Sequence, residues 1–230
     1  KLRERIDEVN RQDPYEKLEK ALKDKKLGFG LRTVKEEEVM KIIKKLPNKS
    51  STGVDLISAK TIKSATGVLA VPLTHIINTS ITTSTYPERW KTARVIPLLK
   101  KGSASDMNNY RPVSLLPVAS KILEEAVRKQ VSSYFEKNKL LPNEQHGFRP
   151  SRSTTSALLS LQHKLIQARE KGDTSVTLLW DLSAAFDTLD HSIFLGKLRS
   201  YGFNEESRKW FCSYLKDRQQ YVDVSGTTSS

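Results

Sequence analysis

The sequence lacks the features that mark disulfide-rich and membrane-spanning proteins. Its 230 residues include one cysteine, Cys212, which excludes an internal disulfide framework and a metal site built from cysteines. Because Cys212 lies in the apolar stretch WFCSYL, we expect a packed, unreactive thiol. No stretch approaches the roughly 18 apolar residues that a membrane helix needs, since Pro72 and His75 interrupt the longest candidate, VLAVPLTHIINTSI. We therefore expect no membrane partner.

A signal peptide, an initiator methionine and a histidine cluster are missing as well. The chain opens on the charged residues KLRERIDEVNRQD, which do not have the pattern of a secretory signal. Without an initiator methionine, a fragment or a trimmed chain is expected. The 4 histidines show no metal-ligand spacing. The length still allows a substantial core, in one large domain or two small ones.

What the sequence has in excess is positive charge. The formal net charge is +13, which predicts attraction to polyanions, and nucleic acid is the commonest of these. The excess lies in the middle of the chain, where residues 89–101 and 145–169 contain basic side chains and no acidic ones. The N-terminal charges alternate in sign, as on exposed helix faces. The alternative is a solvated basic surface without a ligand.

Periodicity and turn residues predict a helix-rich α+β chain. A polar helix that Pro14 can split is expected over residues 1–26. Further helices are expected over 33–46, 56–65, 68–80, 117–136, 154–171, 191–200 and 204–216. Strands are expected over 93–102, 110–116, 174–182 and 219–226, the first cut short by Pro97. Because helices or long loops separate the strands, the order favours α+β over a sandwich.

The sequence also predicts which of these elements are buried and where two of the helices begin or end. The continuous apolar run in 174–182 indicates a strand that is buried on both faces. Thr33 is expected to cap the helix over 33–46, and Ser153 or Thr154 the helix that Gly172 ends. One apolar stripe of that second helix is expected to be buried: Ala157, Leu158, Leu161, Leu165 and Ala168.

The predicted strand over 174–182 ends on the carboxylate of Asp181. A carboxylate at a strand end near basic segments suits a divalent cation that handles phosphate. Two alternatives stay open: Asp181 caps the next turn, or it is an aspartyl nucleophile of the haloacid-dehalogenase type. The second alternative is disfavoured, because those sites carry another aspartate two residues on and this chain has Ser183 there.

Three stretches, in this order, closely resemble reverse transcriptases of non-LTR retrotransposons, and the jockey-like mobile elements in particular: NNYRPVSLLPVASKILE, LPNEQHGFRPSRST and LLWDLSAAFDTLDH. Upstream, LPNKSSTGVDLISAKTIK and YPERWKTARVIPLLKKG resemble the extension before the fingers of those enzymes. The resemblance implies the α+β fold of a right-hand polymerase. It implies an N-terminal helical extension over 1–33, a family-specific helical extension over 34–89, fingers over 90–173 and a partial palm over 174–230.

The same resemblance implies roles for the residues around Asp181. Asp181 matches the first catalytic aspartate, which with the Leu182 carbonyl would bind Mg²⁺, or Mn²⁺. Phe186 matches the aromatic that faces the nucleotide sugar and excludes a 2′-hydroxyl, and its alternative is a core aromatic. Asp187 is expected to be a structural hydrogen-bonding residue.

Further roles fall on the fingers. Lys121 matches a basic residue against the nucleotide phosphates, and Arg111 and Arg149 lie in the two most family-like loops, where a guanidinium can grip phosphate oxygens. For each of the three, the alternative is a salt bridge that orders its loop. Gly147 is expected to allow close approach of the template, and Arg152 to contact nucleic acid.

The resemblance is incomplete, because the sequence contains no Tyr-x-Asp-Asp turn and no two adjacent aspartates. A lone Asp181 cannot assemble a two-metal site, so we expect part of an RNA-directed DNA polymerase that is inactive alone. The alternative is a non-catalytic nucleic-acid-binding remnant of a decayed mobile element. The parent is expected to use an RNA template, a DNA primer and deoxynucleoside triphosphates, in nucleus and cytoplasm. The oligomeric state stays open.

Overall fold

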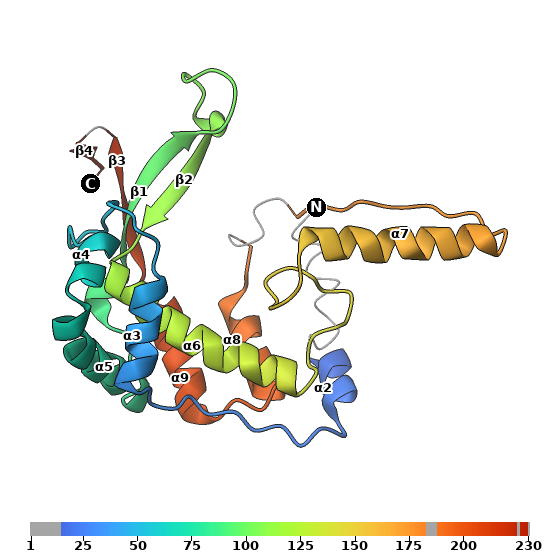
Figure 1. Cartoon of the computed structure of the whole chain (residues 1–230), viewed down its shortest axis with the longest axis horizontal. Coiled ribbons are helices and arrows are strands. Elements are labelled where there is room, and N and C mark those ends of the chain that lie inside the picture. The colour runs from blue at the N-terminus through green and yellow to red at the C-terminus, as the bar shows by residue number, and fades with distance from the viewer. Residues whose placement is uncertain (1–14, 183–187, 225, 230) are drawn as a thin grey trace. The chain divides into compact units, whose positions relative to one another are not determined.

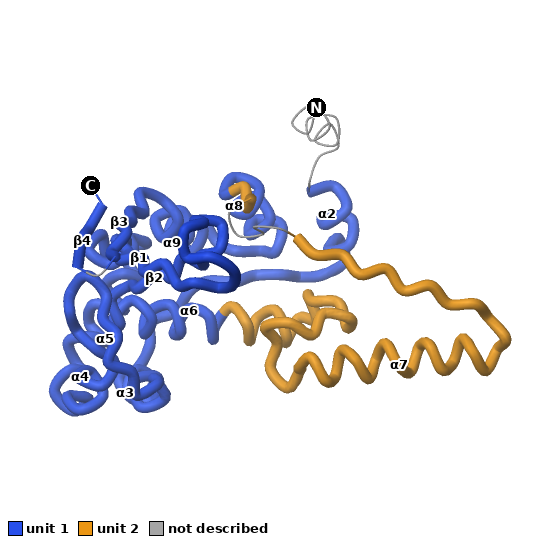
Figure 2. The backbone as a smooth tube through the Cα atoms, turned by 90° about the horizontal axis from the view of Figure 1, so that it is seen from above, with its two compact units in different colours: residues 1–130, 191–230 blue, residues 131–190 orange. Residues whose placement is uncertain are grey.

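The computed structural model describes residues 15–182, 188–224 and 226–229. These divide into two compact units, one from the described residues within 1–130 and 191–230 and the other from those within 131–190 (Figure 2). The first is called unit 1 and the second unit 2. The fold is mixed helix and sheet, as the sequence predicts.

Unit 1 contains a four-stranded sheet in the order β2-β1-β3-β4. Its strands are β1 (Thr92–Leu99), β2 (Tyr110–Leu115), β3 (Gln219–Val224) and β4 (Thr227–Thr228). β1 and β2 form an antiparallel hairpin (Figure 1), whereas β1 and β3 pair in parallel. The expectation that Pro97 cuts β1 short is wrong. The pairing with β3 ends at Val95, so at Pro97 the strand has a hydrogen-bonded neighbour on one side only, where a proline is tolerated.

The helices of unit 1 follow the predicted order with shifted ends. They are α2 (Glu16–Leu22), α3 (Glu36–Lys45), α4 (Ala59–Ser64), α5 (Thr66–Thr82), the part of α6 (Val118–Lys137) up to Gln130, α8 (His191–Ser200) and α9 (Glu205–Leu215). Two short 3₁₀ helices, η1 (Glu88–Trp90) and η2 (Met107–Asn109), precede β1 and β2. Among these described helices, none is both long and apolar enough to cross a membrane.

The core of unit 1 is formed by apolar side chains from several helices. The fully buried ones include Val39, Ile43, Ile77, Ile122, Leu123 and Trp210. Trp210 of α9 stacks on Tyr214, and its indole Nε1 donates a hydrogen bond of 3.0 Å to Ser80 Oγ of α5. The buried indole N–H is therefore satisfied, as a buried tryptophan requires. Cys212, on the same helix, is only partly buried.

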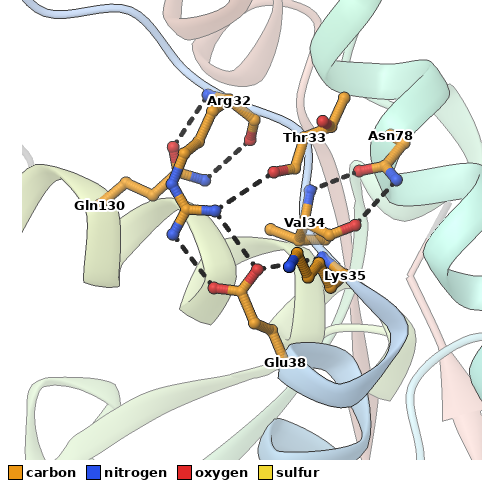
Figure 3. Close-up of polar contacts among 7 residues, drawn as sticks. All are labelled: Arg32, Thr33, Val34, Lys35, Glu38, Asn78 and Gln130. Atoms are coloured by element: carbon orange, nitrogen blue, oxygen red, sulfur yellow. Dashed lines mark hydrogen bonds and ion pairs between the residues drawn. The ribbon is translucent and has the colours of Figure 1, made fainter.

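An extended strap, residues 28–35, precedes α3 and is held by side chains of α5 and α6 (Figure 3). The Gln130 carboxamide accepts from Arg32 N at 2.9 Å and donates to Arg32 O at 3.0 Å. The Asn78 carboxamide binds Val34 in the same way, at 2.8 and 3.0 Å. Each carboxamide thus satisfies the strap's backbone as a neighbouring strand would.

The predicted start of α3 at Thr33 is wrong, and the strap explains why. The helix is preceded by Lys35 as N-cap, not Thr33. The Glu38 carboxylate accepts from Lys35 N at 3.0 Å and pairs with the Arg32 guanidinium at 3.1 Å (Figure 3). Because Gln130 and Asn78 hold the strap extended through Val34, the helix cannot begin at Thr33.

Unit 2 contains the end of α6, the loop 138–152, helix α7 (Thr154–Glu170) and the segment that follows it. Ser153 caps α7 by accepting from Ser156 N at 3.2 Å, and Gly172 follows the helix with φ +77°. Both ends of this helix were predicted correctly.

The burial predicted for unit 2 is wrong. No residue of α7 is buried, and Leu158 is 66% exposed. Residues 174–182 are not a strand among the described residues, and Trp180 is 89% exposed. An apolar run becomes a strand only beside a hydrogen-bonding neighbour, and a helical stripe is buried only against a facing surface. The described part of unit 2 supplies neither partner.

Candidate functional site

The β1–β2 hairpin presents cations at and near its tip. Arg111 is exposed on β2 opposite Leu98 of β1, and Lys100 and Lys101 are exposed where β1 ends. The tip is fixed by its own polar groups: Tyr110 Oη donates to Ala104 O at 2.9 Å. Arg111 shows no ion pair with any other described residue, so its guanidinium can bind an external anion.

Two of the cations in the stretch 89–101 are paired with acidic side chains in the fold. Lys91 is buried, and its Nζ lies 2.7 Å from Glu88 Oε1. Arg94 is partly buried and pairs with Asp223 of β3, with 3.5 Å between Nε and Oδ2. These two cations are structural, and the cations of this stretch that stay exposed are Arg89, which precedes β1, and Lys100 and Lys101, where β1 ends.

Helix α6 begins with an exposed cation, followed one turn later by a partly buried acid. Lys121 is exposed in the first turns, and Glu124, one turn on, is partly buried. The hydroxyl of fully buried Tyr86 donates a 2.9 Å hydrogen bond to Glu124 Oε1. Burial raises the pKa of Glu124, although the hydrogen bond from Tyr86 and the charge of Arg218 act in the opposite direction. Burial also raises the pKa of Tyr86, so this phenol stays protonated.

Aromatic rings complete this cluster. The Arg218 guanidinium lies 4.9 Å from the ring centre of Tyr214 and 5.7 Å from that of Tyr86. The Tyr86 and Tyr214 rings meet edge to face, with centres 5.1 Å apart. Cation–π contacts of this kind are stronger when desolvated. The cluster therefore fixes the start of α6, and with it the helix position that carries Lys121.

A second support for the start of α6 comes from Gly53, in the loop between α3 and α4. A Cβ on Gly53 would lie 2.5 Å from Pro117 N and 2.6 Å from the carbonyl carbon of Leu116. Only glycine allows the loop to approach the backbone between β2 and α6 so closely. The stretch around Gly53 thus buttresses the connection between Arg111 and Lys121.

In unit 2, Arg149 braces the loop 138–152. Its guanidinium pairs bidentately with Glu136 at the end of α6, at 2.9 Å to Oε1 and 2.7 Å to Oε2. Its Nη1 also donates to Pro142 O at 2.7 Å, and its side chain is 9% exposed. Hydrogen bonding to Arg149 lowers the pKa of Glu136. This geometry favours the alternative in which Arg149 orders its loop.

The other predicted residues of the loop are at least partly accessible. Arg152 is partly buried and donates to Asn143 O at 2.8 Å through Nη1. Gly147 is exposed, and a Cβ there would meet no atom within 4 Å. His146 Nδ1 lies 2.7 Å from Ser156 Oγ, which links the loop to the first turn of α7. The loop is thus held at both ends, with open space beside Gly147.

Asp181 and Leu182 are exposed at the end of the 174–182 segment. Phe186 and Asp187 lie outside the described residues. Among the residues that are described, no three His, Cys, Asp or Glu side chains gather as a metal site would require. The described carboxylates therefore do not form a metal centre by themselves, and Asp181 can supply only one carboxylate to such a centre.

The structure thus brings together some of the predicted residues. Arg111 and Lys121 lie at the two sides of one connection in unit 1, and Gly147, Arg149 and Arg152 share one loop in unit 2. Sequence reasoning missed Glu136, the partner of Arg149, and Gly53. The only sequence signal for Gly53 is a glycine inside a loop-like stretch, which does not tell what it approaches.

Residues 98–229 match the family described as "Reverse transcriptase (RNA-dependent DNA polymerase)". This match covers more than half of the chain, from the end of β1 to β4. The chain belongs to the reverse transcriptase family. The match includes all of the predicted site residues in one continuous region, from Arg111 to Phe186.

This reverse transcriptase chain is similar to polymerases of mobile elements. It is 31% identical over 205 residues to the RNA-directed DNA polymerase from mobile element jockey of Drosophila melanogaster, covering 89% of this chain and 22% of that protein. It is 27% identical over 219 residues to the probable RNA-directed DNA polymerase from transposon BS of the same species, covering 95% and 24%.

A more distant relative is the group II intron-encoded protein LtrA of Lactococcus lactis subsp. cremoris, 29% identical over 122 residues, which cover 51% of this chain and 19% of that protein. The predicted resemblance to jockey-like reverse transcriptases is confirmed. The chain spans about a quarter of the length of the mobile-element polymerases that it matches.

Proposed function

We propose that this chain is part of an RNA-directed DNA polymerase of a non-LTR retrotransposon, and that it contacts nucleic acid and nucleotide phosphates. The observation that carries the proposal is the match of residues 98–229 to the reverse transcriptase family. The names of the mobile-element relatives supply the type of polymerase. In the complete polymerase the partners are an RNA template, a DNA primer and deoxynucleoside triphosphates.

In this proposal residues 90–173 belong to the fingers and 174–230 to the start of the palm, with helical extensions over 1–33 and 34–89. Arg111 and Lys121 contact phosphates, because both are exposed and the connection between them is buttressed by Gly53. Arg152 contacts the nucleic-acid backbone beside Gly147. Arg149 keeps the loop in shape through Glu136, so its contribution to phosphate binding is indirect.

Asp181 would bind Mg²⁺, or Mn²⁺, together with the Leu182 carbonyl and further carboxylates. A bound divalent ion makes a hydroxyl a better nucleophile and neutralises phosphate charge. Because the sequence has no two adjacent aspartates, we expect the 230-residue chain alone to bind nucleic acid without extending a primer. The alternative, a non-catalytic nucleic-acid-binding remnant of a decayed mobile element, predicts the same behaviour for the chain alone.

Binding is tested by titrating the chain with a fluorescent single-stranded RNA at several salt concentrations. Phosphate contacts release counterions, so affinity should fall steeply with salt. Replacing Arg111, Lys121 and Arg152 together by Gln should reduce the slope of log K against log salt by about 0.7 for each lost contact.

The matched control removes three exposed lysines from the N-terminal region, Lys17, Lys23 and Lys26. It changes the net charge equally and should leave most of the slope intact. Equal slopes for the two triple variants would mean that binding follows net charge alone. That result would contradict the phosphate contacts assigned to Arg111, Lys121 and Arg152. Circular dichroism checks that both variants fold.

Catalysis is tested by primer extension with Mg²⁺ and with Mn²⁺. Extension by the wild-type chain that exceeds extension by Asp181→Asn would contradict the expected inactivity.

In a complete polymerase that carries these residues, Asp181→Asn should abolish incorporation of both deoxyribonucleotides and ribonucleotides. Phe186→Val should there raise ribonucleotide incorporation about 10-fold or more, which corresponds to ~1.4 kcal/mol of lost discrimination. An unchanged ratio of the two nucleotides would identify Phe186 as core packing.

A further inference from the structure

Phe148 is 97% exposed, at a position where the backbone disfavours a phenylalanine. Its φ is +60°, in the left-handed region that bulky side chains rarely adopt. Exposing the ring also forgoes the burial that normally makes an aromatic side chain stabilising. Neither the backbone conformation nor the exposure contributes to stability, so a local strain of this kind points to a function.

The surrounding loop holds Phe148 in this position from both sides. Arg149, the next residue, ties the loop to Glu136 and to Pro142 O. Two residues before the ring, His146 contacts Ser156 of α7. The polar contacts fix the backbone while the ring itself points away from the protein. Such a preformed, rigid aromatic loses little conformational entropy when a ligand covers it.

The neighbours of the ring indicate the chemistry of that ligand. Gly147 leaves open space beside it, and the loop positions around it are polar or small, as in Gln145 and Ser151. A protein partner would need a wider apolar surface around an anchoring ring. The stretch 145–169 carries basic side chains and no acidic ones, which suits a ligand with a flat apolar face and an anionic backbone.

We propose that Phe148 is a stacking platform for one base of single-stranded nucleic acid, an inference that rests on the proposed nucleic-acid binding and adds a base contact to it. Stacking on an aromatic side chain is tolerant of sequence, because every base has a π-face. Phe148 acts on the base, whereas Arg111, Lys121 and Arg152 act on phosphates. The two kinds of contact respond differently to the ligand and to salt.

The test compares two ligands of equal length and charge, a short oligodeoxythymidine and the same strand with abasic sites throughout. Phe148→Gly should weaken binding of the base-containing strand by about 5- to 150-fold, which corresponds to ~1–3 kcal/mol. It should leave binding of the abasic strand and the salt slope unchanged. Its melting temperature should not fall, because glycine adopts positive φ without strain. Phe148→Tyr, which keeps the π-face, should retain the wild-type affinity for both strands.

The matched control is Leu158→Ala, which removes another exposed apolar side chain of unit 2. Alanine is used at this position because a glycine would weaken the helix. Leu158→Ala should change the affinity for neither strand.

Equal weakening of both strands by Phe148→Gly, or a lower melting temperature of that variant, would assign Phe148 a structural role and overturn the inference. An unchanged affinity of Phe148→Gly for the base-containing strand would also overturn it while leaving the proposed function intact. If the wild-type chain binds neither strand, the proposed function itself fails, and the base contact with it.

Discussion

Near its start, in unit 1, helix α6 packs Ile122 and Leu123 into a core and places the partly buried Glu124 against Tyr86. Near its end, in unit 2, the same helix carries Glu136, which binds Arg149 at the margin of an exposed loop. Burial raises the pKa of the first glutamate, and a guanidinium lowers that of the second. The start of α6 is thus stabilised by burial in a core, and its end by an ion pair with an exposed loop.

The difference extends to the apolar residues of the two units. In unit 1, side chains from α3, α5, α6 and α9 are fully buried. In the described part of unit 2, α7 has no buried residue and the apolar segment 174–182 is exposed. Unit 1 is therefore stabilised by apolar burial, and the loop of unit 2 by hydrogen bonds and one ion pair. Local polar contacts can shape a binding loop without a core beneath it.

The largest difference is expected between two apolar truncations. Ile122→Ala removes a fully buried side chain of α6 and should lower the free energy of unfolding by about 2–5 kcal/mol. Leu158→Ala removes a side chain that is 66% exposed and should change it by no more than about 0.5 kcal/mol. Urea unfolding followed by circular dichroism measures both. A comparable loss in the two variants would show that α7 is buried in solution and would end the contrast.

A smaller difference is expected between two glycines. Gly53→Ala places a Cβ against Leu116 and Pro117, and the backbone shift should cost about 1–3 kcal/mol. Gly147→Ala meets open space, and no positive φ constrains it, so its stability should stay within about 0.5 kcal/mol of wild type. Thermal unfolding measures the effect, and RNA binding by Gly53→Ala shows whether the connection that carries Arg111 and Lys121 has moved. Equal stability of the two variants would show that the loop around Gly53 does not press on this backbone.

Much of unit 1 could be predicted because its elements carry their signals locally. The apolar spacing of 33–46 predicts α3, in which Val39, Ile42 and Ile43 are buried, and the alternation in 219–226 predicts β3. The exact start of α3 could not be predicted, because Gln130 and Asn78, distant in sequence, hold the strap extended. Local pattern determines an element, and distant contacts determine where it ends.

Unit 2 shows the limit of the same reasoning. The apolar run in 174–182 has the composition of a buried strand, but composition does not supply the neighbouring strand. For the site, the family-like stretches single out Arg149, and only the fold shows that Glu136, on the preceding helix, accepts its hydrogen bonds. The exposure and positive φ of Phe148 have no sequence signature.

A local effect is expected when the brace of the loop is weakened. Arg149→Lys keeps the charge, but an ammonium cannot form the bidentate pair with Glu136 and also reach Pro142 O. Amide hydrogen exchange should become faster across 142–153 and stay unchanged in α9, because local opening does not require global unfolding. The control is Arg128→Lys, whose guanidinium pairs with Glu125 within one helix. Equal exchange in wild type and Arg149→Lys would show that the loop keeps its shape without the brace.

The smallest effect, and the most direct test of the comparison, is the pH dependence of the two glutamates of α6. The folded pKa of Glu124 is raised, so its stabilising contribution is present below the unfolded pKa and is lost as pH rises through the folded pKa. The folded pKa of Glu136 is lowered, so its contribution is present above the unfolded pKa and is lost as pH falls through the folded pKa.

Gln is the neutral replacement at both positions, and hydrogen exchange of peptides from α9 and from 142–153 reports unit 1 and unit 2 separately. From about pH 4 to about pH 7, the interval above the usual carboxyl pKa, Glu124→Gln should gain protection in α9 relative to wild type. Over the same interval Glu136→Gln should lose protection in 142–153 relative to wild type. The two difference curves must slope in opposite directions. Difference curves that slope in the same direction would mean that burial at Glu124 does not outweigh Tyr86 and Arg218. Both ends of α6 would then be held by the same kind of polar contact.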